Sequence, residues 1–127
     1  GVDSGFAIYD MMRFIKNPVR TVAAGLCASA GIIVFLGGDK GNRLTLTHSR
    51  FMIHQPSTSS YGQASDLEIA ANEIVKIRHK LYDLIARETK IDVEQVKTDS
   101  RRDFWLSAED SVKYKLADRL ITSFDEW

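Results

Sequence analysis

Three side chains of this sequence are of the types that together perform nucleophilic hydrolysis, namely Ser29, His54 and Asp103. A serine hydroxyl attacks a carbonyl when an imidazole takes its proton, and a carboxylate can orient that imidazole. Ser29 lies between a predicted strand and a predicted helix, and its small neighbours Ala28 and Ala30 leave room for a substrate. The G-x-S-x-G pattern of a nucleophile elbow is absent, so a helix cap is the alternative role for this serine.

The other two residues lie where polar segments meet apolar ones. His54 ends the apolar run 51–53 before a polar loop, where an imidazole can face a cleft and act as a general base. Asp103 follows two arginines and precedes the apolar run 104–106. A core-edge histidine and a carboxylate paired with an arginine are the alternatives, because most chains of this length contain some Ser, His and Asp.

Cys27 is the single cysteine, which excludes an internal disulfide and a cysteine-rich zinc module. A reducing compartment is the simplest interpretation. Its apolar neighbours predict a buried, inert thiol and not a nucleophile. His48 and His79 are expected at solvated positions, and no histidines are spaced i,i+3 or i,i+4, so no metal site is expected.

The charge balance limits the classes of partner. The 127 residues include 17 Lys and Arg and 17 Asp and Glu, which gives a formal net charge of zero. A nucleic-acid partner is not expected, because duplex binders carry a basic excess. The longest apolar stretch, 22–36, is shorter than the roughly 20 residues of a membrane-spanning helix, so no membrane partner is expected either.

Periodicity, turn residues and cap signals predict the elements that must position these residues. A largely buried helix is expected from near Ser4 to before Asn17-Pro18, and an exposed loop over 55–62. Asp92 with Gln95, and Ser107 with Asp110, have the spacing of helix caps. Further helices are expected over 32–36, 64–87, 93–99 and 108–115, and strands over 19–24, 44–46, 51–53 and 119–122. Strands that alternate with helices indicate an α/β fold.

The helix over 64–87 is long for a chain of this size. At 1.5 Å per residue it measures roughly 36 Å. Part of it is therefore expected to project from the body or to pack on another chain. One face of this helix carries apolar residues at helical spacing, namely Leu67, Ala71, Ile74, Leu81 and Ile85.

Segments from about residue 6 to residue 122 match the motifs of one family in order. They are Ala7-Ile8-Tyr9-Asp10, the small-residue run 25–31, Ser49-Arg50, Met52-Ile53-His54-Gln55-Pro56, Gly62-Gln63-Ala64 with Asp66 and Glu68-Ile69, Arg102-Asp103, Leu106-Ser107-Ala108 and Leu116-Ala117-Asp118. Together they resemble the proteolytic subunit of the Clp proteases, the caseinolytic serine peptidases. The resemblance implies a crotonase-like α/β fold of repeated ββα units with a projecting handle helix.

The resemblance also implies roles for the residues at the matching positions. Ser29 would be the nucleophile, His54 the general base and acid, and Asp103 the orienting carboxylate. The backbone amide of Ala30 would be one oxyanion donor. The reaction would be serine-type endopeptidase cleavage of unfolded polypeptide in ATP-dependent protein degradation, in the bacterial cytoplasm or in an organelle matrix or stroma.

Partners follow from the same resemblance. The handle region, about 55–88, would stack two heptameric rings, with Gln63, Ala64 and Arg102 at the inter-ring contact. A hexameric AAA+ unfoldase would be the second partner and would bind the ATP. No cofactor is expected in this chain, because it holds no G-x-x-x-x-G-K-[ST] loop. Phe14 and Ile121 match positions that line the docking groove for the unfoldase.

The sequence departs from the family pattern at three points. Ala30 stands where the family usually has methionine, and Arg101 where it commonly has an acidic residue. The chain also begins just after the position of the family's glycine-rich oxyanion loop. Residues 1–127 are therefore expected to be a single domain that lacks the N-terminal strands, and to be inactive or poorly folded by themselves.

Two alternative functions remain open at this point. A non-catalytic structural subunit of the same barrel would have lost members of the triad. A crotonase-type acyl-CoA enzyme would need CoA contacts and an acidic catalytic residue in place of the Ser29 and His54 pair.

Overall fold

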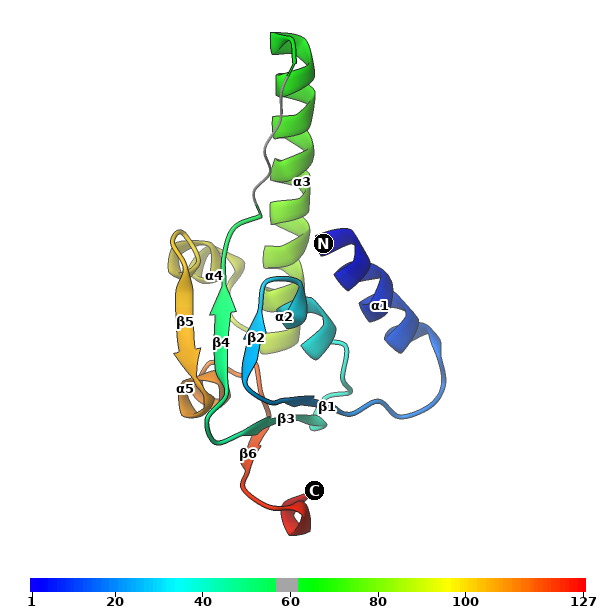
Figure 1. The fold of residues 1–127 in the computed structure, drawn as a ribbon, viewed down its shortest axis with the longest axis vertical. Coiled ribbons are helices and arrows are strands. Elements are labelled where there is room, and N and C mark those ends of the chain that lie inside the picture. The colour runs from blue at the N-terminus through cyan, green and yellow to red at the C-terminus, as the bar shows by residue number, and fades with distance from the viewer. Residues whose placement is uncertain (57–61) are drawn as a thin grey trace.

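The computed structural model describes residues 1–56 and 62–127, so the middle of the predicted loop 55–62 lies outside the described residues. The chain forms helices and strands in alternation, as predicted for an α/β protein (Figure 1). In order they are α1 (Val2–Phe14), β1 (Thr21–Ala23), β2 (Leu26–Ala28), α2 (Ala30–Phe35), β3 (Arg43–Leu46), β4 (Arg50–Ile53), α3 (Ala64–Thr89), α4 (Val93–Asp99), β5 (Phe104–Ser107), α5 (Ala108–Lys113), β6 (Arg119–Ile121) and a last 3₁₀ turn, Phe124–Glu126.

The strands form two small sheets that the chain visits alternately. One sheet has the order β1-β3-β6 with parallel pairing throughout, and the other has the order β2-β4-β5. In the second sheet β2 and β4 are parallel, whereas β4 and β5 are antiparallel. The segments β1-β2-α2 and β3-β4-α3 therefore repeat one pattern, in which two strands enter different sheets before a helix follows.

A corner at Gly25 separates the first two strands, and it corrects the single strand expected over 19–24. Gly25 has φ +88°, a conformation that residues with a Cβ rarely adopt. The Arg50 N–H donates to the Gly25 carbonyl over 2.8 Å, and the buried Ser49 hydroxyl donates to Ala23 O over 2.7 Å. The turn therefore sends the chain into the second sheet, and the small residues after it form β2, which the sequence pattern did not predict.

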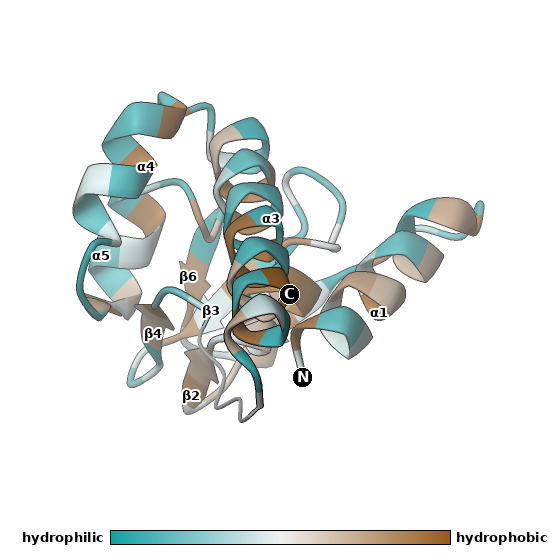
Figure 2. Ribbon diagram, turned by 90° about the horizontal axis from the view of Figure 1, so that it is seen from above, coloured by the Kyte–Doolittle hydropathy of each residue, from teal (hydrophilic) through white to brown (hydrophobic). Residues whose placement is uncertain are grey.

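The other predicted elements agree with the structure to within a few residues, with one omission. Strand β5, residues 104–107, was not predicted, although its apolar run 104–106 is present in the sequence. The Ser107 hydroxyl accepts the Asp110 N–H, as its cap spacing predicted. The Asp92 carboxylate also caps its helix, although it accepts the N–H of Glu94. The charged helices α4 and α5 lie on one side of α3 and α1 on the other (Figure 2).

Helix α1 is not largely buried, and this part of the prediction is wrong. Only Gly5 and Tyr9 of this helix are buried, whereas the Phe14 side chain is 81% exposed. The helix packs closely on α2 at Gly5. A Cβ at this position would lie only 3.2 Å from the Cβ of Ala30, so the close approach of the two helices depends on the missing side chain. Its dense apolar sequence therefore presents a second face that the described residues do not cover.

Helix α3 projects from the body, as its length predicted (Figure 1). Its C-terminal part packs in the core, where Leu81 and Ile85 are buried. Its N-terminal half stands clear of the sheets, and Leu67 is exposed there although it lies on the predicted apolar face. Among the described residues, no helix is both long enough and apolar enough to cross a membrane.

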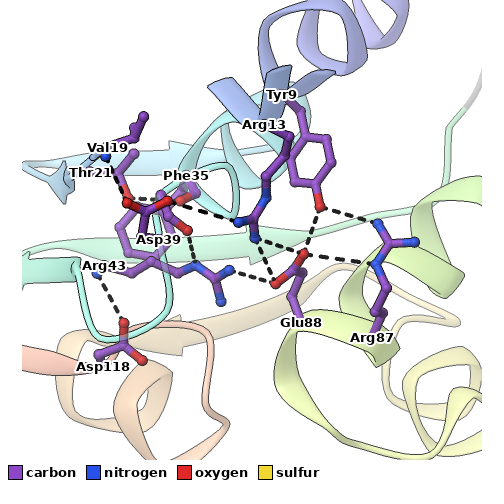
Figure 3. Close-up of polar contacts among 11 residues, drawn as sticks. Tyr9, Arg13, Val19, Thr21, Phe35, Asp39, Arg43, Arg87, Glu88 and Asp118 are labelled. Carbon is purple, nitrogen blue, oxygen red and sulfur yellow. Dashed lines mark hydrogen bonds and ion pairs between the residues drawn. The ribbon is translucent and has the colours of Figure 1, made fainter. Parts of the chain in front are cut away.

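A cluster of charged side chains fixes the base of α3 to the body (Figure 3). The carboxylate of Glu88 accepts hydrogen bonds from Tyr9 Oη at 2.6 Å, Arg13 Nη2 at 3.1 Å and Arg43 Nη2 at 2.5 Å. Arg43 is fully buried, and its Nε also donates to the Gly38 carbonyl. These residues come from α1, β3 and α3, so one carboxylate joins three elements that are distant in sequence.

Candidate functional site

The three residues proposed for hydrolysis lie just beyond the ends of three adjacent strands. Ser29 follows β2, His54 follows β4, and Asp103 precedes β5. Strand β4 lies between the other two, with Ala28 paired to Met52 on one side and Ile53 paired to Phe104 on the other. Because neighbouring strands are about 4.8 Å apart, all three side chains are placed at the same edge of the sheet, with the histidine in the middle.

The backbone of Ser29 is strained. It has φ 57° and ψ −123°, and it is one of three non-glycine residues with positive φ in the described part of the chain. Its N–H donates to Met52 O over 3.2 Å, and its carbonyl accepts the N–H of Ile32 at the start of α2. A serine forced into such a conformation between a strand and a helix is what a nucleophile elbow requires, although the usual glycines are missing.

We expect Ser29→Gly to be more stable than Ser29→Ala by about 1 kcal/mol. Both variants lose the hydroxyl, but only alanine keeps the Cβ that makes this conformation cost roughly 1–3 kcal/mol. The larger unfolded-state entropy of glycine offsets about 0.5–1 kcal/mol of the gain. Urea denaturation of the two variants measures the difference. Ala30→Gly, at a residue in ordinary helical conformation, is the control and should be destabilising, and a more stable Ser29→Ala would contradict the strain.

The imidazole of His54 is held by the next residue. Its Nδ1 lies 2.8 Å from the backbone carbonyl oxygen of Gln55, and the ring is half-buried. A carbonyl oxygen can only accept a hydrogen bond, so Nδ1 carries the proton in this contact. In the neutral ring, Nε2 is then the nitrogen that carries no proton. His54 therefore has the tautomer that a general base for a serine hydroxyl needs.

Asp103 lies opposite His54 in strand register, but no hydrogen bond joins the two side chains in the described part of the chain. The antiparallel pairing of Ile53 with Phe104 makes residues 54 and 103 the next pair. The carboxylate is exposed, and among the hydrogen bonds of the described residues none joins Asp103 to His54. The structure thus pairs strand β2, which precedes Ser29, with strand β4, which precedes His54. The hydrogen-bond partner of His54 Nδ1 is the Gln55 carbonyl, where a catalytic triad would have its carboxylate.

The remaining sites of chemical interest are outside this edge. Cys27 is buried within β2, and burial raises the pKa of its thiol to about 12, as expected for an inert cysteine. His48 and His79 are both exposed, in agreement with the solvated positions expected for them. In the part of the chain that the structure describes, no three Cys, His, Asp or Glu side chains are grouped as a metal site would need.

The residues matched to binding surfaces are dispersed. Phe14 extends from the end of α1, whereas Ile121 is buried in β6 and lines a shallow cavity with residues of the β1–β2 corner. Gln63 precedes α3, and its carbonyl accepts the N–H groups of the first turn. Ala64 begins that helix at the end distant from the body, and Arg102 is exposed in the loop before β5.

One polar contact at the site was not predicted from the sequence. The side-chain amide of Gln55 donates to the backbone carbonyl of Arg101 over 3.2 Å and so joins the histidine segment to the acid segment. The pairing of β4 with β5 is what brings these two segments together, and β5 was not predicted. In the sequence, the one indication of this contact is that a glutamine, which can donate a side-chain hydrogen bond, follows His54 directly.

Comparison with known proteins agrees with this architecture. The family model for Clp protease matches residues 1–124. The chain is 47% identical to the ATP-dependent Clp protease proteolytic subunit 2 of Treponema pallidum (strain Nichols) and 43% identical to the ATP-dependent Clp protease proteolytic subunit of Porphyromonas gingivalis (strain ATCC BAA-308 / W83), in each case over 94% of this chain. It spans 60% of the length of the first relative and 54% of the second.

Similarity extends to the solved structures. A mutant of ClpP1 from Listeria monocytogenes superimposes with a TM-score of 0.90 at 39% identity, and the match covers 98% of this chain and 69% of the other. This match confirms the crotonase-like α/β fold that the sequence motifs implied. With the family model and the two relatives in agreement, the chain belongs to the Clp protease family.

Proposed function

We propose that this chain supplies the catalytic part of a serine endopeptidase subunit for ATP-dependent protein degradation. The observation that carries the proposal is Ser29 in a strained strand-to-helix turn, beside strand β4, which His54 follows. The bacterial relatives, which are named as proteolytic subunits, support the same class of reaction. Residues 1–127 would act as one domain of such a subunit, with the handle region at about 55–88.

In the proposed reaction, His54 Nε2 takes the proton of the Ser29 hydroxyl as this attacks a peptide carbonyl. The His54 Nδ1–H group keeps a hydrogen-bond acceptor throughout, so the ring can become positively charged without losing its orientation. The N–H of Ala30 at the start of α2 would stabilise the oxyanion, since the first N–H groups of a helix have no partner within it. His54 then protonates the leaving amine, and water releases the acyl group from Ser29.

A fluorophosphonate probe tests the proposal directly. The full-length protein, assembled and supplied with its unfoldase, is treated with the probe, and the labelled residue is identified by mass spectrometry. Labelling is expected at Ser29, absent in Ser29→Ala and strongly reduced in His54→Ala. A complex that is assembled but not labelled would refute the peptidase and favour a non-catalytic subunit of the same barrel.

The crotonase-type alternative is disfavoured by the residues at the site. Acyl-CoA chemistry of that class would need an acidic catalytic group where Ser29 and His54 stand. Of the three matched residues, the only carboxylate is Asp103, which is exposed. Hydrolysis of acyl-CoA by the full-length protein without cleavage of peptides would reverse this preference.

The proposed assembly follows from the surfaces that the described residues leave uncovered. The projecting half of α3 exposes Leu67 and Ile69, which a second ring would cover. Gln63, Ala64 and Arg102 are accessible for that contact. An AAA+ unfoldase is the proposed source of unfolded substrate and the site of ATP hydrolysis. Docking is proposed at Phe14, which is exposed, and at Ile121, which is buried and would contribute only through the cavity that it lines. The proposal includes no cofactor in the chain itself, and the proposed location is the bacterial cytoplasm, or an organelle matrix or stroma if the protein is eukaryotic.

A further inference from the structure

We propose that Gln55 is a positioning residue that holds the acid segment 100–103 against the histidine strand. The proposal rests on the proposed function and deepens it, because it identifies what couples Asp103 to His54. Gln55 is joined to both partners: its backbone oxygen lies 2.8 Å from His54 Nδ1, and its side-chain nitrogen donates to Arg101 O over 3.2 Å.

The hydrogen bond between Gln55 and Arg101 lies beyond the end of the β4–β5 pairing, where backbone pairing no longer holds the two segments together. The paired residues of β4 and β5 end with Ile53 and Phe104. In the same register the next residues along are His54 and Asp103, so the proposed catalytic pair lies just outside the sheet, where no strand pairing fixes its separation. The hydrogen bond from Gln55 to Arg101 lies farther out along the same direction. It therefore closes the open end of the two segments and limits how far Asp103 can move from the imidazole.

The Gln55 side chain is half-buried, just beyond the end of strand β4. The one hydrogen bond of the Gln55 side chain among the described residues is the bond to the Arg101 carbonyl.

The chemical consequence concerns the partner of His54 Nδ1. In this structure the Gln55 carbonyl accepts the Nδ1–H group, and Asp103 is exposed. A carboxylate stabilises the imidazolium formed during serine attack better than a neutral carbonyl does, because a hydrogen bond between charged groups is the stronger one. The tether keeps Asp103 near enough to take over this hydrogen bond when substrate is bound. Gln55 thus acts on the reaction through Asp103 and His54, without contact with substrate.

The test replaces the amide by groups of similar length that cannot donate. Gln55→Met and Gln55→Glu are made in the full-length protein, assembled with its unfoldase, and cleavage of a fluorogenic peptide is measured. Active sites are titrated with a fluorophosphonate so that kcat refers to folded, reactive subunits. We expect both variants to lose about tenfold in kcat, at the lower end of the losses found when groups that orient metal-binding histidines are replaced, with KM within about twofold of wild type.

Gln95→Met is the matched control. Gln95 also donates one side-chain hydrogen bond, to Asp99 within α4, and the Gln95 side chain is exposed. Its kcat should equal that of wild type. Unchanged kcat in both Gln55 variants would overturn the inference, and so would a rise in KM at constant kcat, which would make Gln55 a substrate contact. If wild type itself is not labelled at Ser29, the proposed function fails and this inference fails with it.

Discussion

Replacement of His54 by alanine in the full-length protein is expected to lower kcat for peptide cleavage by about 10⁶-fold. In serine peptidases, removal of either the nucleophile or the base costs about as much as removal of the whole triad, because the two act as a unit. Ser29→Ala should therefore show the same loss, and the double variant no further one. The measurement is kcat with a fluorogenic peptide, with KM expected to change little.

Asp103→Ala provides the internal comparison. It is expected to lose about 10⁴-fold in kcat, less than His54→Ala, because the Gln55 carbonyl still holds the Nδ1–H group and hence the correct tautomer. Equal losses in the two variants would show that the carbonyl contact does not sustain the imidazole. Retention of most activity in His54→Ala would exclude the proposed mechanism altogether.

The second large effect is on stability. Glu88→Ala is expected to lower the free energy of unfolding by about 3–5 kcal/mol, because it leaves the buried Arg43 guanidinium without its carboxylate. Tyr9 and Arg13 lose an acceptor at the same time. Chemical denaturation at one fixed protein concentration measures the change. Glu73→Ala is the matched control on the same helix: its pair with Lys76 is exposed and should contribute less than 1 kcal/mol.

The Glu88 contribution should also depend on pH. Burial opposes ionisation of Glu88, but the hydrogen bonds from Tyr9 and Arg43 and the nearby arginine charges outweigh it, so its pKa is lowered from the ordinary 4.5. A carboxyl whose pKa is lower in the folded state stabilises that state above its unfolded pKa, and this contribution is lost as pH falls through the folded value. The difference in stability between wild type and Glu88→Gln should therefore be constant near pH 7 and shrink below about pH 4.5. A difference that grew on acidification would contradict the role of the carboxylate.

Much of this architecture was accessible from local pattern. The caps at Ser107 and Asp92, the long helix α3 and its projection all follow from spacing that short-range forces decide. The strand containing residues 51–53 was likewise recognised from its apolar run. The motifs around Ser29, His54 and Asp103 indicated the family because their residue types and their order along the chain match those of its members. Caps, helix length and motif order can be recognised from residues that are close together in the sequence, so these features could be predicted without knowing which distant segments pack against them.

Other features depend on contacts between distant segments, and only the tertiary structure decided them. The break at Gly25 and strand β5 exist because partners elsewhere in the chain accept their hydrogen bonds. The exposure of α1 likewise reflects which face finds a partner, which its apolar composition alone does not reveal.

The electrostatic cluster at Glu88 and the orientation of His54 also depend on contacts that form only in the folded chain. Glu88 bonds to residues 45 and 79 positions away, and no pattern in the sequence indicates their meeting. The sequence by itself determined which residues could carry out hydrolysis and in which kind of element each lies. The tertiary structure decided that Ser29 is strained, that His54 Nδ1 donates to Gln55, and that Asp103 lies opposite His54 with no hydrogen bond between them among the described residues. Each depends on the register of strands that meet only in the fold.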